Sequence, residues 1–219
     1  MLRALFEKTG NAVYISHLDL MRLFQRAFKR AGLKLTHTQG YNPRPSVSIA
    51  LPLSVGVESH CELLDFDLEG EMISCEEILE RLNAALVEGV RVLSVYPGGD
   101  KIRNIALLDC TVFLEYDNGI SCGAVEVLKK LFAQPALMVD KRGKNGVTQQ
   151  NIIPLIRHLQ IKQTNENTLC IDARICCQNP ALNPMQMVAA IEKYLPEMKP
   201  DFSRCCRHEI YHLDESIFR

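Results

Sequence analysis

The sequence predicts an α+β protein of two tandem ferredoxin-like (βαββαβ) domains, the first with an extra strand from an N-terminal hairpin. Strand-like and helical runs in the first half follow the order β-α-β-β-α-β once the hairpin is allowed for. Pro97-Gly98-Gly99-Asp100 then interrupts the chain, and the second half repeats the plan. The expected domains are residues 1–97 and 104–219, and a chain of 219 residues is long enough to bury a core in each.

The first domain is expected to open with a hairpin and a helix. Residues 2–7 and 12–15 have strand character on either side of the turn Thr9-Gly10-Asn11. Ser16 is a favourable N-cap, and Gly32 ends the helical run that follows it. Between these two residues the apolar side chains recur at helical spacing: Leu20, Leu23, Phe24, Ala27, Phe28 and Ala31.

The remaining elements follow from apolar runs separated by turn residues. Residues 38–45 contain two prolines, which exclude a helix and a central strand, so this segment is expected to be a stiff loop. The first domain then continues with strands at 46–51, 63–68 and 90–96 and a helix at 75–86 capped by Ser74. In the second domain we expect strands at 110–116, 136–141, 168–176 and 207–213, and helices at 121–132, 151–160 and 184–195.

Composition indicates an ordinary globular protein of the cytoplasm. Hydrophobic residues make up 47% and charged residues 23% of the chain, and no tract has low complexity. No run reaches the roughly 20 apolar residues of a membrane-spanning helix, and charges interrupt the N-terminus before a secretory segment could form. The nine cysteines are odd in number and irregularly spaced, so we expect buried thiols rather than a disulfide framework.

The net charge of −1 conceals an asymmetry along the chain. Residues 16–45 contain six basic side chains and one acid, Asp19, whereas residues 57–80 contain nine acids and no Lys or Arg. The first segment could contact phosphate or carboxylate groups, and the second would repel them.

The first helix carries the main candidate site. Arg22, Arg26 and either Lys29 or Arg30 recur at i, i+4 and i+7 or i+8, so their cationic groups are expected to line one face, opposite the apolar stripe. Arginine suits phosphate because its planar fork donates two hydrogen bonds at once. The alternative is a solvated helix face that binds nothing.

His17 stands at the start of the same helix, where the macrodipole and free N–H groups could hold an anion. It could donate a hydrogen bond to a substrate, or it could be structural, paired with a carbonyl or with Asp19. Acid–base catalysis needs a second group, for which His37 is the nearby candidate.

The loop 40–45 combines an aromatic ring, an amide and a guanidinium, from Tyr41, Asn42 and Arg44, on a backbone stiffened by proline. Such a loop could stack on and orient a planar polar ligand at little cost in entropy. The alternative is a turn that delivers the next strand, with Tyr41 packed inward.

No motif points to a metal or a cofactor, and we expect neither. Cysteine pairs could converge with a histidine only if the strands at 168–176 and 207–213 paired, and adjacent cysteines on a strand point to opposite faces. The residues concerned are Cys176, Cys177, Cys205, Cys206, His208 and His212. There is no C-x-x-C, no ligand set for a radical SAM iron–sulfur cluster, and no G-x-G-x-x-G, P-loop, H-E-x-x-H or G-x-S-x-G pattern.

Several motifs in order resemble the radical-SAM-linked proteins. They are Phe6-x-Lys8-x-Gly10, Ser16-His17-Leu18-Asp19 with Arg22, Arg26, Arg30 and Gly32, Gly40-Tyr41-Asn42-Pro43-x-Pro45, and Pro52-Leu53-x-x-Gly56-Val57-Glu58-Ser59 with Glu62 and Asp65. Proteins of that family occur alone or fused behind a cobalamin-binding radical SAM protein, often encoded near ribosomal-protein and ribonuclease genes, and have no established activity. The resemblance implies a radical SAM enzyme as partner and adds Lys8 to the candidate binding residues.

Three functions remain open. The first is an accessory protein that binds RNA or another anionic substrate for a partner radical SAM enzyme, through the helix arginines and the loop. The second is a stand-alone RNA-processing or modifying enzyme that uses His17, by analogy of fold. The third is an adaptor that docks the radical SAM partner through the acidic segment 57–80. The sequence favours a binding protein over an enzyme.

Overall fold

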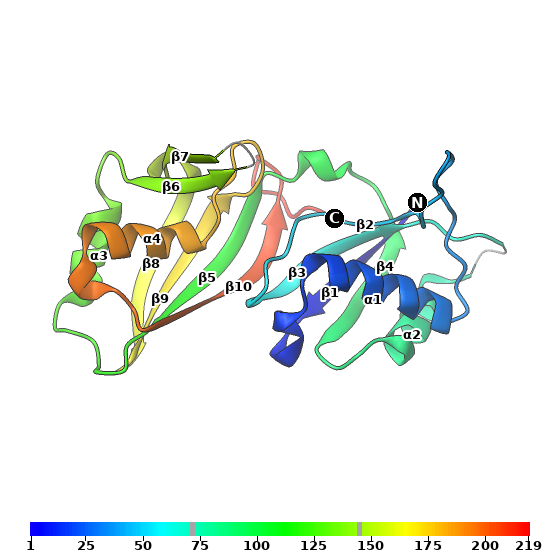
Figure 1. Cartoon of the computed structure of the whole chain (residues 1–219), viewed down its shortest axis with the longest axis horizontal. Coiled ribbons are helices and arrows are strands. Elements are labelled where there is room, and N and C mark those ends of the chain that lie inside the picture. Colours follow the sequence, from blue (N-terminus) through cyan, green and yellow to red (C-terminus); the bar gives the residue numbers. More distant parts are fainter. Residues whose placement is uncertain (71–72, 144–145) are drawn as a thin grey trace. The chain divides into compact units, whose positions relative to one another are not determined.

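A computed structural model describes residues 1–70, 73–143 and 146–219, and within them the chain is a mixed α+β protein with four α-helices and ten strands (Figure 1). It divides into two compact units, residues 1–102 together with Arg219, and residues 103–218. In the described part of the chain, no helix combines the length and the apolar character needed to cross a membrane.

Unit 1 is a four-stranded antiparallel sheet with two helices. Its strands lie in the order β4-β1-β3-β2, so the first strand is central, between the last and the third. Both helices lie on one face of this sheet (Figure 1). In chain order the elements are β1 (Leu2–Lys8), α1 (His17–Arg30), β2 (Val47–Ile49), β3 (Val57–Phe66), α2 (Cys75–Ala85) and β4 (Val90–Pro97).

The helix α1 forms where the sequence predicts it, for the local reasons given. The Ser16 side chain accepts a hydrogen bond from the backbone N–H of Asp19, and the chain leaves the helix at Gly32 with a φ of +69° that suits glycine. Phe24 packs edge-on against Phe6 of β1 with ring centroids 4.8 Å apart. The apolar stripe therefore fixes which face of α1 remains exposed.

The predicted N-terminal hairpin is wrong. Residues Gly10–Tyr14 form a 3₁₀ helix instead of a second strand, and β1 already has β3 and β4 on its two sides. The Lys8 ammonium donates to the carbonyls of Val13 and Ile15, and Thr9 N–H donates to the Gly89 carbonyl. These tertiary contacts outweigh the turn-forming tendency of Thr9-Gly10-Asn11.

Unit 2 has a second four-stranded antiparallel arrangement, in the order β10-β5-β9-β8, with a separate two-stranded hairpin. Helices α3 and α4 lie on one face of the strands (Figure 1). In chain order the elements are β5 (Leu107–Glu115), α3 (Ala124–Phe132), β6 (Met138–Gly143), β7 (Gly146–Asn151), β8 (Ile156–Asn165), β9 (Thr168–Cys176), α4 (Met185–Tyr194) and β10 (Phe202–Tyr211).

The predicted helix at 151–160 is also wrong, because residues 156–165 form β8, which pairs with β9. Ile152, Ile156 and Leu159 are spaced as on one face of a helix, which explains the prediction. Pro154 confines the local helical geometry to the short turn Ile153–Leu155, and pairing with β9 sets the conformation that follows.

Alternate residues of β5 separate the two faces of this arrangement. Leu108, Cys110, Val112 and Leu114 are at most 2% exposed and belong to the core. The residues between them, Asp109 and Thr111 among others, face the opposite side.

Candidate functional site

The three predicted arginines of α1 do line one hollow. It has a volume of about 440 Å³, and its floor and walls are largely apolar. Arg22, Arg26 and Arg30 contribute the cationic side chains and Asp19 the one carboxylate. The complete lining is Ile15, Asp19, Arg22, Leu23, Arg26, Arg30 and Val87.

The three guanidinium groups differ in their partners. Arg22 Nη1 lies 2.9 Å from Asp19 Oδ1, and Arg30 donates to the carbonyl of Ala85, the last residue of α2. Hydrogen bonds from Ser16 and Arg22 lower the pKa of Asp19, so this carboxylate is ionised at neutral pH. Arg26 makes no hydrogen bond or ion pair with any part of the chain that the structure describes. The Arg26 side chain is therefore the cation in this hollow that a ligand could engage without displacing a protein partner.

Lys8 does not reach the surface. Its side chain is 0% exposed, and its ammonium lies 3.1 and 3.2 Å from the carbonyl oxygens of Val13 and Ile15. These bonds tie the segment just before α1 to strand β1. Lys8 therefore positions the start of the helix, and the structure corrects its assignment as a residue that contacts a ligand.

His17 is the first residue of α1, and its Nδ1 atom is buried without a hydrogen-bond partner among the described residues. His37, the second group proposed for catalysis, lies elsewhere: its backbone bridges to Pro45, and its Nδ1 is 4.0 Å from Glu69. No hydrogen bond in the described structure joins the two imidazoles. The arrangement thus offers no acid–base pair at the helix start.

The loop 40–45 is closed at its base and open at its tip. Thr38 N–H donates to the Arg44 carbonyl, and Arg44 N–H donates to the Thr38 hydroxyl. Tyr41 is 100% exposed, so the alternative of an inward-packed ring is wrong, and Asn42 and Arg44 are exposed as well. None of these residues lines the hollow on α1, so the expected common groove is not formed.

The acidic segment 57–80 is divided between core and surface. Glu62 is 2% exposed and accepts a hydrogen bond from Ser59, and Asp65 is 7% exposed and pairs with Arg3. Glu71 lies outside the described residues. The exposed acids include Glu69 and those of the first half of α2, Glu76, Glu77 and Glu80.

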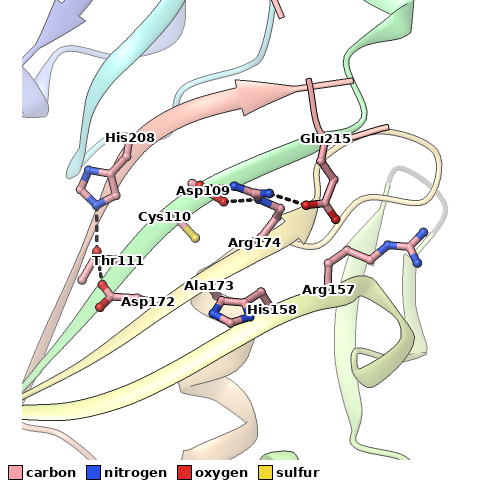
Figure 2. Close-up of a pocket in the computed structure, with 10 residues that line it drawn as sticks. All are labelled: Asp109, Cys110, Thr111, Arg157, His158, Asp172, Ala173, Arg174, His208 and Glu215. Carbon is pink, nitrogen blue, oxygen red and sulfur yellow. Dashed lines mark hydrogen bonds and ion pairs between the residues drawn. The ribbon is translucent and has the colours of Figure 1, made fainter. Parts of the chain in front are cut away.

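A second pocket, which the sequence reasoning missed, lies on the unit 2 sheet and has a volume of about 590 Å³ (Figure 2). Its polar side chains come from four strands and from the segment after β10. Ten residues line it: Asp109, Cys110, Thr111, Arg157, His158, Asp172, Ala173, Arg174, His208 and Glu215. Asp109 faces Arg174, and Thr111 faces Asp172, as direct cross-strand pairs of β5 and β9.

One end of this pocket is built around Arg174 (Figure 2). Its Nε and Nη2 atoms each lie 2.8 Å from an oxygen of Asp109, and its Nη1 lies 2.6 Å from Glu215. Burial opposes ionisation of Asp109, but hydrogen bonds from Arg174 and Tyr211 prevail and lower the pKa of this carboxyl. The hydrogen bond from Arg174 to Asp109 correspondingly raises the pKa of the guanidinium. The result is a charged wall in which one guanidinium pairs with two carboxylates.

The other end is a chain of three polar groups (Figure 2). The Thr111 hydroxyl lies 2.6 Å from Asp172 and 2.8 Å from His208 Nε2. Burial raises the pKa of Asp172, but hydrogen bonds from Lys162 and Thr111 outweigh it and lower the pKa overall. Because an ionised Asp172 only accepts, Thr111 donates to it and His208 Nε2 donates to Thr111. His208 cannot then take the Thr111 proton, so this is not a nucleophile–base pair.

The cysteine pairs do not form the cluster considered from the sequence. Strand β5 lies between β9 and β10, so Cys176 and Cys205 are not on paired strands. Within the described residues no group of three His, Cys, Asp or Glu side chains could hold a metal ion.

Comparison with known proteins places the chain in a bacterial family. A family model described as "Uncharacterized protein conserved in bacteria (DUF2344)" matches residues 1–184. The chain belongs to this family. In this DUF2344 chain the match includes the arginine hollow and strands β5, β8 and β9 of the unit 2 pocket, but not His208 or Glu215. A comparison with curated proteins gave no match.

Two solved structures share parts of the chain trace with this DUF2344 protein. One, described as "Crystal Structure of a Cbf5-Nop10-Gar1 Complex", has a TM-score of 0.48 and 5% identity over 94% of this chain and 48% of that chain. The DUF2344 chain thus spans about half the length of that protein. The other, an unknown protein from Galdieria sulphuraria, has a TM-score of 0.27 and 12% identity, with 94% and 95% of the two chains covered.

Proposed function

We propose that this protein is an accessory module that binds RNA, or another anionic substrate, through the arginine face of α1 and presents it to a partner radical SAM enzyme. The observation that carries the proposal is the shared hollow of Arg22, Arg26 and Arg30. The radical SAM partner rests on the resemblance of the motifs in residues 6–65. No catalytic step is assigned to the chain.

The electrostatics of the hollow favour an anionic ligand. Three guanidinium groups face one carboxylate, Asp19, so the local balance is positive although the chain as a whole is near neutral. Arg26 can receive a phosphate at once, and Arg22 can exchange its exposed bond to Asp19 for a phosphate at little cost. The apolar side chains Leu23 and Val87, which line the same hollow, suit the sugar and base edges of a nucleotide.

The exposed ring of Tyr41 supports a second, separate contact. Unstacked bases of single-stranded RNA stack on aromatic side chains, and the loop that carries Tyr41 is held at its base by Thr38 and Arg44. An extended RNA strand, unlike a compact ligand, could contact both Tyr41 and the arginine hollow although the two do not share a groove.

We further infer that both units are variants of the ferredoxin-like plan. The strand orders β4-β1-β3-β2 and β10-β5-β9-β8, antiparallel throughout, support this assignment. In unit 2 the hairpin β6–β7 would then be an insertion between the first helix and the second strand of the plan.

The test is binding of a fluorescein-labelled single-stranded RNA of mixed sequence, followed by fluorescence anisotropy at several salt concentrations. Arg26→Glu should weaken binding about tenfold or more, because a charge-assisted interaction becomes a repulsion. The slope of log K against log salt should become shallower by about 0.7 for each phosphate of the single strand that the variant no longer neutralises.

Lys29→Glu is the matched control. It makes the same change of charge on the same exposed helix, but Lys29 does not line the hollow. Lys29→Glu should leave affinity within about twofold of wild type. If Arg26→Glu and Lys29→Glu weaken RNA binding equally, or if neither changes it, the hollow on α1 is not the binding site.

The other two hypotheses have less support from the geometry. An RNA-processing enzyme based on His17 would need a second catalytic group beside it, and His37 is engaged near Glu69. A docking surface made by the acidic segment would lack Glu62 and Asp65, whose carboxylates are buried. Cleavage of RNA by the purified protein, but not by its His17→Ala variant, would favour the enzyme. Co-purification with the radical SAM protein that is lost at high salt would favour the adaptor.

A further inference from the structure

The unit 2 pocket has the features of a binding site that is independent of the arginine face on α1. It lies on the side of the sheet opposite the core residues of β5, and a volume of about 590 Å³ falls within the range of small-molecule sites. Polar side chains occupy most of this face of the sheet, so the face does not contribute the apolar burial that a second hydrophobic core would give. Thr111 in particular is a polar residue only 6% exposed.

Two β-bulges direct side chains to this pocket from opposite sides. The register of β8 against β9 shifts between Ile156 and His158, so Arg157 is the extra residue of that strand. The register of β10 against β5 shifts between Arg207 and Glu209, so His208 is the extra residue there. Bulges re-aim side chains and often lie beside functional sites, and here both strands that flank the β5–β9 pair carry one at the same hollow.

The hydrogen-bond inventory of the pocket shows what a ligand must supply. Both oxygens of Asp109 and of Asp172 already accept bonds from protein donors, and Glu215 accepts one from Arg174. The two donor side chains on β8, by contrast, are not engaged by the protein. Neither Arg157 nor His158 forms a hydrogen bond or ion pair with the described residues, and both line the pocket.

One cation at the pocket has no ion-pair partner among the described residues and is available to an anion. Arg174, Lys162 and Arg157 together balance the charges of Asp109, Asp172 and Glu215, but Arg174 and Lys162 make all the ion pairs that the structure describes here, which leaves the guanidinium of Arg157 for a ligand. The guanidinium of Arg157 and the imidazole of His158, from adjacent residues, can both donate to phosphate, which accepts several hydrogen bonds at once. Each oxygen of Asp172 takes one protein donor and keeps a second lone pair, so this end can also accept hydrogen bonds from hydroxyl groups of the same molecule.

We propose that unit 2 binds a small phosphorylated, hydroxyl-bearing molecule, a sugar phosphate or a mononucleotide, with its phosphate on Arg157 and His158 and its hydroxyls toward Asp172. In Figure 2 Arg157 lies toward the Glu215 end of the pocket and the Thr111–Asp172–His208 chain at the other end. A ligand with an anionic group and a polyol part spans such a site. The proposal does not depend on RNA binding by α1.

The experiment is isothermal titration calorimetry of the full chain with ribose 5-phosphate, adenosine 5′-monophosphate, inorganic phosphate and ribose. Ribose 5-phosphate or the mononucleotide should bind more tightly than inorganic phosphate, and ribose should show no heat of binding. Arg157→Gln and His158→Gln should each weaken binding by about tenfold to a hundredfold, the effect of losing a charge-assisted hydrogen bond. The relative affinity of the two phosphorylated probes tells whether a base contributes.

Lys130→Gln is the control, since it removes one exposed positive charge from α3 without touching the pocket. Arg157 and His158 are exposed on their strand, so both variants should fold, which circular dichroism and the urea midpoint would check. Arg26→Glu should leave this binding unchanged. The proposal is overturned if no phosphorylated probe binds, if inorganic phosphate binds as tightly as ribose 5-phosphate, or if the β8 variants bind as wild type does.

Discussion

Replacing Asp65 by alanine should destabilise the protein by about 3–5 kcal/mol, the usual cost of removing one partner from a buried ion pair. Arg3 is fully buried, with side-chain exposures of 0% for Arg3 and 9% for Asp65. Its Nε and Nη2 atoms donate to the two carboxylate oxygens at 2.6 and 2.9 Å. Without the carboxylate, the guanidinium stays buried with its charge uncompensated.

The size of the effect can be checked by urea unfolding followed by circular dichroism. With a slope of about 2 kcal/mol per M urea, a loss of about 3–5 kcal/mol moves the midpoint of the affected transition down by roughly 1.5–2.5 M. Arg22→Ala removes an ion pair with a single N–O contact whose side chains are 65% and 60% exposed, and it should cost less than about 1 kcal/mol.

A double variant separates the cost of an uncompensated charge from that of a cavity. Arg3→Met with Asp65→Leu replaces both ions by apolar groups, and buried pairs replaced in this way are often neutral or stabilised. We therefore expect the double variant to be more stable than Asp65→Ala alone. The reasoning is refuted if the double variant is as unstable as the single one, or if Asp65→Ala shifts the midpoint no further than Arg22→Ala.

Three further predictions test the packing, the helix cap and the charged wall of unit 2. Phe24→Ala should cost about 3–5 kcal/mol in urea unfolding, and a loss below about 1 kcal/mol would contradict its place in the core. Ser16→Ala should cost about 1 kcal/mol through the lost bond from Asp19 N–H, whereas Ser16→Thr should keep most of it. The lowered pKa of Asp109 in the folded state adds stability that is fully present above the unfolded value of about 3.9 and is lost as the pH falls through the folded value. The stability difference between wild type and Asp109→Asn should therefore shrink below about pH 4 in urea titrations between pH 3 and 7, and a constant difference would exclude this linkage.

Local patterns in the sequence predicted the structure correctly where the residues of one element determine its conformation. Helix α1 has a cap, an apolar stripe and a terminating glycine within residues 16–32, and the arginines on its exposed face follow from the same periodicity. The position of these arginines on one face of α1 could therefore be predicted from the sequence. The other wall of their hollow, which includes Val87 after α2, depends on tertiary packing.

The failures all involve contacts that the local periodicity of the sequence does not show. The hairpin prediction failed because Lys8, a charged residue that is expected at the surface, is buried. Its ammonium group donates hydrogen bonds to two backbone carbonyls. The helix predicted at 151–160 failed because pairing with β9 decides the conformation of β8. The unit 2 pocket was invisible for the same reason. Asp109 and Arg174 are 65 residues apart, and neither strand alone shows that they face each other.

The bulges of β8 also affect how the protein behaves at high concentration. Among the described residues β8 has β9 as its one strand partner, so its other side carries backbone N–H and C=O groups that a strand of another molecule could pair with. Register shifts near both ends of β8, together with the charges of Arg157 and Lys162, make this side irregular and repulsive to such a strand. The distortion that turns Arg157 and His158 toward a ligand therefore also protects the molecule from edge-to-edge aggregation.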